Sequence, residues 1–197
     1  MASMAVAQTN KSAYFLLDYD LEASGYQGPT DLLGIGGREL VGFALYARQW
    51  ENAKGFTVEF TWDPAYAEFR SNTSAPSIVD DEYDINGTEG LIPDNEDNIL
   101  GNELITSGLT DDEGYYTNSY AMSGGDAVNG DGLVYFAVFR TVEDLDTETR
   151  FAIKAEVTVA DASSQTRYLG ERTFFVNGTV DVKDATWGEF KKQYSDF

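Results

Sequence analysis

The segment Gly55–Pro64 constrains the fold of this chain more than any other stretch. Its even positions are large and apolar and the odd positions between them are polar: Phe56, Val58, Phe60 and Trp62 against Thr57, Glu59 and Thr61. A period of two is the pattern of a β-strand with one face in a core and the other in water. Asp63-Pro64 then ends the strand, because proline has no N–H to offer to a neighbouring strand. We therefore predict that Glu59 and Thr61 point outward from a half-buried sheet.

Apolar alternation recurs along most of the chain and predicts its fold class. Further strands are expected over residues 13–21, 38–50, 133–139, 151–159, 166–176 and 178–182. The segment Leu133–Phe139 is apolar on both faces, which is typical of a central strand in a packed sandwich. Residues that favour turns separate the runs, among them Asn52–Gly55 and Asn129–Gly132. The pattern predicts an all-β protein, a jelly-roll β-sandwich of about nine strands.

The domain organisation follows from where the apolar alternation begins and ends along the chain. We expect a disordered N-terminal segment over residues 1–11, a sandwich over 12–182 and a tail over 183–197. Within the sandwich, residues 70–125 are acidic and weakly periodic, which predicts long loops with two or three short strands. The tail carries aromatic side chains at helical spacing, so a short C-terminal helix is expected there.

Composition excludes several classes of function. The chain has 34 Asp and Glu against 13 Lys and Arg, a net charge of −21, so nucleic acid is an unfavourable partner. It has no cysteine and no histidine, which excludes disulfides, Cys/His zinc sites and histidine-based catalytic triads. No run of about 18 apolar residues is present, so membrane insertion is not expected. Met1–Met4 has no features of a signal peptide, and we expect that a native signal is missing from this start.

Three stretches together resemble a cohesin module, the β-sandwich of cellulosomal scaffoldins and related bacterial and archaeal surface proteins. The segment Glu39–Tyr46, followed by Gly55–Pro64, is similar to the family's early strand and its strand ending in Tyr-Asp-Pro, with Trp62 in place of that tyrosine. Asn129–Phe139 is similar to its Asp-Gly turn and buried strand, and Arg172–Val182 to its closing strand. Carbohydrate-binding modules share this architecture, so fold alone does not determine function.

The resemblance implies a non-catalytic extracellular module, secreted or at the cell surface, that docks a dockerin-type or other surface protein. In dockerin-binding cohesins, polar residues of the strand before Tyr-Asp-Pro help to form the docking surface. Gly55 and Thr57 occupy matching positions here and form a weaker polar set. Asn177–Asp184 also resembles half of a dockerin calcium loop, but Thr173 and Phe175 stand where acidic ligands belong, so a closing strand and linker helix are favoured.

The residues themselves suggest which side chains contact a partner. Outward positions of the Gly55–Pro64 strand and aromatic rings near predicted loops are the candidates: Thr57, Glu59, Thr61, Tyr115 and Tyr116. Tyr120 and Trp50 also lie beside predicted loops, where binding and packing roles both stay open. An alternative function is a carbohydrate-binding or adhesin module that contacts polysaccharide. Enzyme activity is not expected, because no sugar-sized cleft with a pair of carboxyl groups is indicated.

One acidic stretch is a candidate for calcium. If Glu82 takes the first position of a calcium loop, Asp84, Asn86 and Gly87 fall at suitable positions, with Glu89 close by. Position twelve is Pro93, so the bidentate carboxylate of an EF-hand is absent. Two interpretations stay open: a calcium site built from Glu82, Asp84, Asn86 and Glu89, or a solvated acidic loop. A calcium-stiffened spacer without a ligand is a third possible function.

Overall fold

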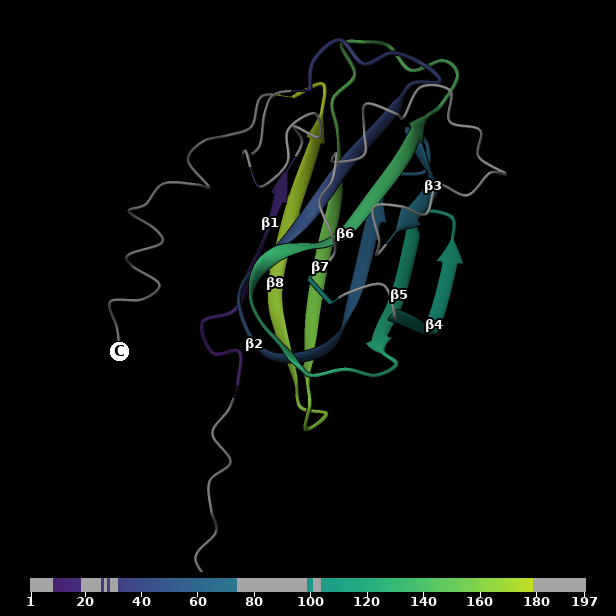
Figure 1. Ribbon diagram of the computed structural model, residues 1–197. Helices are drawn as coiled ribbons and strands as arrows, with labels where there is room; N and C mark the ends of the chain where they lie inside the picture. The colour runs from purple at the N-terminus through teal and green to yellow at the C-terminus, as the bar shows by residue number, and fades with distance from the viewer. Residues whose placement is uncertain are drawn as a thin grey trace, which may run out of the picture.

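The computed structural model describes residues 9–18, 26, 28, 32–73, 99–100 and 104–178, and the side chains of 71–73 and 104–111 are not described. In this part of the chain, the regular secondary structure is β-strand. These residues contain no helix, and their eight strands (Figure 1) are β1 (Tyr14–Asp18), β2 (Leu40–Trp62), β3 (Ala67–Thr73), β4 (Leu104–Asp112), β5 (Tyr115–Met122), β6 (Val128–Thr141), β7 (Phe151–Asp161) and β8 (Thr166–Val176). The predicted all-β class is confirmed. The helix expected over 183–197 lies outside the described residues.

The long strand β2 belongs to both layers of the sandwich. Its first half pairs with β6 over Leu40–Ala47 and with β1 over Ala44–Arg48, and β3 extends this layer on the far side of β6. Its second half lies between β5 and β7, and β4 and β8 form the two edges of that layer. One layer therefore has the order β1-β2-β6-β3 and the other β4-β5-β2-β7-β8 (Figure 1).

The predicted turn at Asn52–Gly55 is wrong, because β2 runs through it without a break. Gln49 and Asn52 each have a φ of 53°, and the pairing with β6 shifts register on both sides of Trp50. The predicted turn at Asn129–Gly132 is likewise inside a strand, β6. Asparagine and glycine favour such left-handed backbone in bulges as well as in turns, so the same residues mark a bend here.

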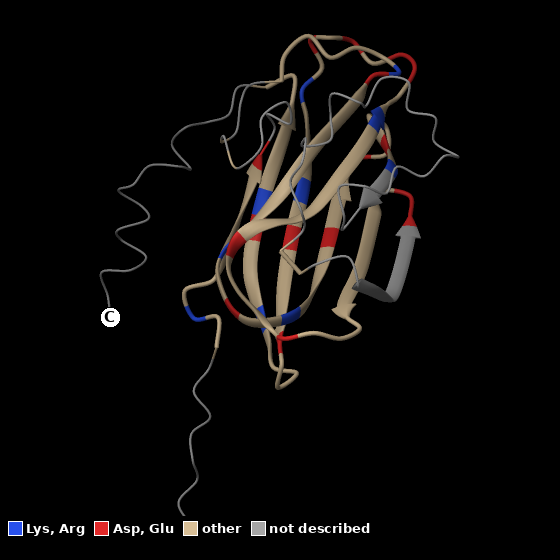
Figure 2. Cartoon of the chain, in the orientation of Figure 1, with Lys and Arg blue, Asp and Glu red and all other residues tan. Residues whose placement is uncertain are grey.

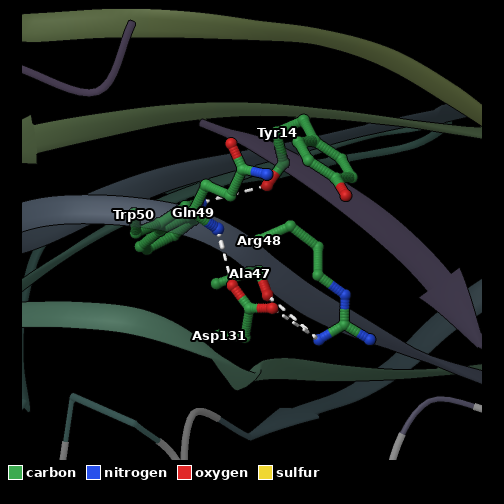
Figure 3. A network of polar contacts seen from close by, with 6 residues as sticks. All are labelled: Tyr14, Ala47, Arg48, Gln49, Trp50 and Asp131. Atoms are coloured by element: carbon green, nitrogen blue, oxygen red, sulfur yellow. Dashed lines mark hydrogen bonds and ion pairs between the residues drawn. The ribbon is translucent and has the colours of Figure 1, made fainter. Parts of the chain in front are cut away.

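Side chains of β6 replace the backbone hydrogen bonds that the bend of β2 loses. The Gln49 N–H donates to Asp131 Oδ1 over 2.7 Å, and the Asn52 N–H donates to Asn129 Oδ1 over 2.8 Å. Figure 3 shows Asp131 under the bend, with Arg48 Nη1 3.8 Å from its other oxygen and the Trp50 indole donating to the Tyr14 carbonyl over 3.1 Å. These contacts fix the point where the chain passes from one layer to the other.

A core of aromatic and aliphatic side chains fills the space between the layers. The Phe43 ring, from the first half of β2, lies 5.5 Å from the Phe60 ring of the second half and 4.7 Å from Phe174 of β8, measured between ring centroids. All residues of Leu133–Phe139 are at most 4% exposed, which confirms the predicted central strand. No helix in the described part of the chain is both long enough and apolar enough to cross a membrane.

Candidate functional site

The outer side of the layer β5-β2-β7-β8 is the polar side of this sandwich. In β2, Phe56, Val58 and Phe60 are at most 2% exposed, whereas the odd-numbered residues between them are half-buried. The predicted outward orientation of Glu59 and Thr61 is therefore confirmed. The period of two places large apolar rings against the core and leaves short polar side chains on the opposite side.

Strand register defines which residues share this side. Residues directly opposite one another in an antiparallel pair point to the same side of the sheet. The outer face, as we call it, thus consists of Thr57, Glu59, Thr61, Tyr115, Thr117, Ser119, Lys154, Glu156, Thr158, Tyr168, Glu171 and Thr173. None of these side chains is buried.

Three glutamates from adjacent strands form a row across the middle of the outer face. Glu59 of β2 is opposite Glu156 of β7, and Glu156 is opposite Glu171 of β8. Figure 2 shows acidic positions side by side on these three strands. We call these residues the glutamate row. Like charges in directly opposite positions destabilise a sheet, so this arrangement is unfavourable for the isolated chain.

Each carboxylate of the glutamate row accepts one hydrogen bond from a neighbour on the same face. The Tyr115 hydroxyl donates to Glu59 Oε2 over 2.8 Å, and the Tyr168 hydroxyl donates to Glu156 Oε2 over 2.8 Å. Lys154 Nζ lies 3.2 Å from Glu171 Oε2. All three contacts go to the Oε2 atom of the carboxylate, and none of them involves the second oxygen.

The hydrogen bonds to Glu59 and Glu156 also raise the pKa values of the two tyrosines that donate them. The hydrogen bond to Glu59 raises the pKa of Tyr115, with a smaller contribution from burial. The hydrogen bond to Glu156 raises the pKa of Tyr168 in the same way. A phenol that donates to a carboxylate is stabilised in its protonated form, so both tyrosines stay neutral hydrogen-bond donors over the physiological range.

The structure separates the two adjacent candidates Tyr115 and Tyr116. Tyr115 is half-buried on the outer face, but Tyr116 is 1% exposed and lies in the core, where its ring centroid is 6.0 Å from that of Phe60. Tyr116 is therefore not available to a partner, and its assignment to the binding surface is corrected. Neighbouring residues of a strand point to opposite sides, so only one of the two could be outward.

Two further aromatic candidates also lie in the core. Trp50 is 1% exposed and Tyr120 is 6% exposed, and both rings pack near Phe56. Among the described residues, Tyr168 is the aromatic side chain with large exposure, at 57%. The sequence predicted that Trp50 and Tyr120 lie near loops, whereas they lie in β2 and β5. The exposed ring, Tyr168, lies in β8.

Gly55 occupies its position because the neighbouring strand is too close for a side chain. A Cβ at this residue would lie 2.3 Å from the Tyr120 carbonyl oxygen. A polar side chain at this point of β2 is therefore incompatible with the packing of β5 against it. For Gly55, this close approach explains the weaker polar set that the sequence indicated.

The remaining members of the outer face were not singled out by the sequence. Glu156, Tyr168 and Glu171 lie on polar positions of alternating segments, which was the available signal. Their position beside Glu59 depends on the pairing of β2 with β7 and of β7 with β8.

The calcium candidates Glu82, Asp84, Asn86 and Glu89 lie outside the described residues, and calcium binding there stays a prediction. Within residues 9–18, 32–70 and 112–178, no group of three Asp or Glu side chains is arranged to hold a metal ion. The glutamate row, whose members lie on three successive strands, is included in that statement.

Comparison with solved structures identifies the fold. No family model matches the sequence, and a search of curated proteins finds no match. A cohesin module of a Clostridium perfringens family 33 glycoside hydrolase is similar, with a TM-score of 0.52, 9% identity, and coverage of 83% of this chain and 94% of that one. The sixth cohesin of Acetivibrio cellulolyticus scaffoldin B, solved in complex with a dockerin, has a TM-score of 0.50 and 9% identity over 75% and 94% of the two chains.

A third similar structure has the same architecture. It is the type II cohesin dyad of an Acetivibrio cellulolyticus adaptor scaffoldin, with a TM-score of 0.51 and 12% identity over 74% of this chain and 46% of that one. The chain is thus a two-layer β-sandwich of the jelly-roll type. Its fold is cohesin-like, as the sequence resemblance implied.

Proposed function

We propose that this chain is a non-catalytic protein-docking module that binds a dockerin-type partner through the outer face. The observation that carries the proposal is the composition of that face in a cohesin-like fold: threonine, tyrosine and glutamate side chains from four adjacent strands, none of them buried. Such a mixed polar surface with tyrosine rings suits contact with a protein.

Support for the partner class comes from a similar structure. The Acetivibrio cellulolyticus scaffoldin B cohesin was solved with a dockerin bound. We extend the same kind of partner to this chain on the basis of its fold and its outer face. We also place the chain in a secreted or cell-surface protein, because similar modules come from scaffoldins.

The alternative function, carbohydrate binding, receives less support from the described residues. Polysaccharide recognition by a sheet uses a row of exposed aromatic rings that stack on successive sugars. On the outer face, Tyr168 is exposed, and Tyr115 is half-buried and hydrogen-bonded to Glu59. Charged carboxylates occupy the positions between them.

A binding comparison discriminates the two functions. The full chain is titrated calorimetrically with a panel of dockerin modules and is applied in parallel to a glycan array. We expect saturable binding to at least one dockerin module and no binding to the array. Clear binding to glycans together with no dockerin binding would reverse the proposal in favour of a carbohydrate-binding module.

A further inference from the structure

The sandwich has a second apolar surface outside its core, on the outer side of the layer β1-β2-β6-β3. It consists of side chains of β2 and β6 that form a cluster separate from the core: Ala44, Tyr46, Leu133, Phe136 and Val138. We call these residues the second face. Each of them is at most 4% exposed. An antiparallel sheet of a sandwich commonly has one side in the core and the other in water, so the burial of this apolar side requires a cover.

Tyr26, from the connection between β1 and β2, lies on the second face. Its ring centroid is 6.0 Å from that of Tyr46, in an edge-to-face arrangement. The guanidinium carbon of Arg48 lies 5.1 Å from the centroid of the Tyr26 ring and 5.7 Å from that of the Tyr46 ring, so one cation contacts both rings. Burial raises the pKa of Tyr26, and the negative charge of Asp18 raises it further, against the opposite effect of Arg48. Tyr26 is therefore held on the sheet by both ring and cation contacts.

The course of the chain between β1 and β2 explains how Tyr26 reaches this place. β1 ends at Asp18, opposite Ala44, and β2 begins four residues before Ala44. The two ends of the connection are thus about 14 Å apart along the sheet, a distance that a few extended residues span. Residues 19–39 contain far more chain than that, and Tyr26 lies beyond both ends, at Tyr46. The connection therefore reverses direction after β1 and crosses the sheet before it returns to β2.

We propose that the second face is an interaction surface whose occupant is this chain's own β1–β2 connection, with Tyr26 as the residue that anchors it. The structure describes Tyr26, Gly28 and residues 32–39 of the connection. Among the described residues, the partly buried apolar side chains that pack against the second face are Tyr26 and Leu40, and Leu40 is the first residue of β2, where the connection ends. This inference goes beyond the docking function and does not depend on what the outer face binds.

Other occupants receive less support. A second copy of this chain or a separate partner would bury the second face only in a complex, whereas its residues are at most 4% exposed in the single chain. Residues 74–98 are another stretch of this chain that could supply a cover. The ring that the structure describes on the face, however, comes from the β1–β2 connection. A substitution at Tyr26 distinguishes the two stretches.

The test measures the solvent contact of methyl groups by NMR of the full chain with a soluble gadolinium chelate, which broadens the signals of exposed methyl groups. Leu133 and Val138 report on the second face, and Leu33, which is 60% exposed, reports on an open position. Tyr26→Ser removes the anchoring ring. Leu33→Ser is the matched control, because it removes a solvent-exposed apolar side chain from the same connection. Tyr26→Phe keeps the ring and removes its hydroxyl.

In the wild type we expect the methyl signals of Leu133 and Val138 to be protected from the chelate and those of Leu33 to be broadened. Tyr26→Ser should abolish the protection of Leu133 and Val138, whereas Leu33→Ser and Tyr26→Phe should preserve it. Broadening of Leu133 and Val138 in the wild type would overturn the proposal, because the face would then be open. Protection that persists in Tyr26→Ser would also overturn it, because another stretch such as residues 74–98 would then be the cover.

A measurement on the wild type keeps the proposal testable if circular dichroism shows that Tyr26→Ser does not fold. Nuclear Overhauser contacts between the ring protons of Tyr26 and those of Tyr46 are expected in the wild type, because the two centroids are 6.0 Å apart. The absence of these contacts in a folded wild-type chain would overturn the proposal, since the anchor would then not lie on the second face.

Discussion

Glu59 on β2 lies directly opposite Glu156 on β7, so two carboxylates occupy one cross-strand pair in the middle of the outer face. The Tyr115 and Tyr168 hydroxyls each donate to one of them, and Lys154 is engaged with Glu171. Opposed carboxylates cost stability in a sheet, and such conflicts in natural proteins are concentrated at functional sites. We therefore propose the outer face as the docking surface.

Removing one of the opposed charges should stabilise the isolated chain. Glu156→Gln keeps an oxygen that can accept from Tyr168 and abolishes repulsion toward Glu59 and Glu171. We expect the free energy of unfolding at pH 7 to rise by about 0.2–1 kcal/mol, measured by urea denaturation. The gain should shrink at about 1 M salt because of screening. Glu148→Gln, in an exposed loop, should leave stability unchanged, and equal effects of the two substitutions would contradict the repulsion.

The bend of β2 depends on Asp131. Asp131→Ala removes the acceptor of the Gln49 N–H, and we expect a loss of about 1 kcal/mol in the free energy of unfolding. Asp131→Asn keeps an oxygen acceptor and should recover most of the loss. Asp126→Ala, at an exposed position two residues before the start of β6, should have little effect. If Asp131→Ala is as stable as the wild type in urea denaturation, the hydrogen bond from the Gln49 N–H to the Asp131 side chain does not stabilise the bend.

Gly55 should tolerate no side chain. A methyl group there would lie 2.3 Å from the Tyr120 carbonyl oxygen, so Gly55→Ala forces β5 away from β2. We expect a destabilisation of about 1–3 kcal/mol, measured by urea denaturation. The matched control is Gly36→Ala, where the nearest atoms to the new methyl would be at 3.4 and 3.6 Å. Similar stabilities for the two variants would show that β5 can move aside without cost.

Alkaline pH should unfold the protein through its buried tyrosines. Burial is the main cause that raises the pKa of Tyr120 and Tyr135, and repulsion from a neighbouring ionised tyrosine adds to it. Unfolded tyrosine ionises near pH 10, so the folded state holds these protons more tightly. Their contribution to stability is complete below about pH 10 and is lost as the pH rises above it.

Unfolding at a series of pH values, followed by circular dichroism with tyrosinate absorbance, checks this dependence. Tyr120→Phe should reduce the loss of stability above about pH 10. At pH 7 the same variant should be less stable by about 1 kcal/mol, because the Asn118 amide loses its 3.0 Å hydrogen bond to the Tyr120 hydroxyl. Stability that does not change between pH 9 and the alkaline limit of the measurement would contradict the raised pKa values.

Local patterns in the sequence predicted which side of β2 and β7 is buried, but not which side of β5, where Tyr116 was expected at the surface. Phe60 and Val134 lie in the core because alternation and uniformly apolar runs encode burial residue by residue. The position of Glu59 opposite Glu156 could not be predicted, because strand register depends on pairing between segments nearly a hundred positions apart. The residues around Asn52 were misinterpreted as a turn, since positive φ serves bulges and turns alike.

The most direct test of the account is the affinity of a dockerin module for two variants of equal bulk. Thr57→Tyr places a ring on the outer face, and Thr147→Tyr places the same ring on an exposed loop after β6. Calorimetric titration should show that Thr57→Tyr weakens binding at least about tenfold, while Thr147→Tyr binds like the wild type. Undiminished binding by a folded Thr57→Tyr variant would contradict the claim that the outer face is the docking surface.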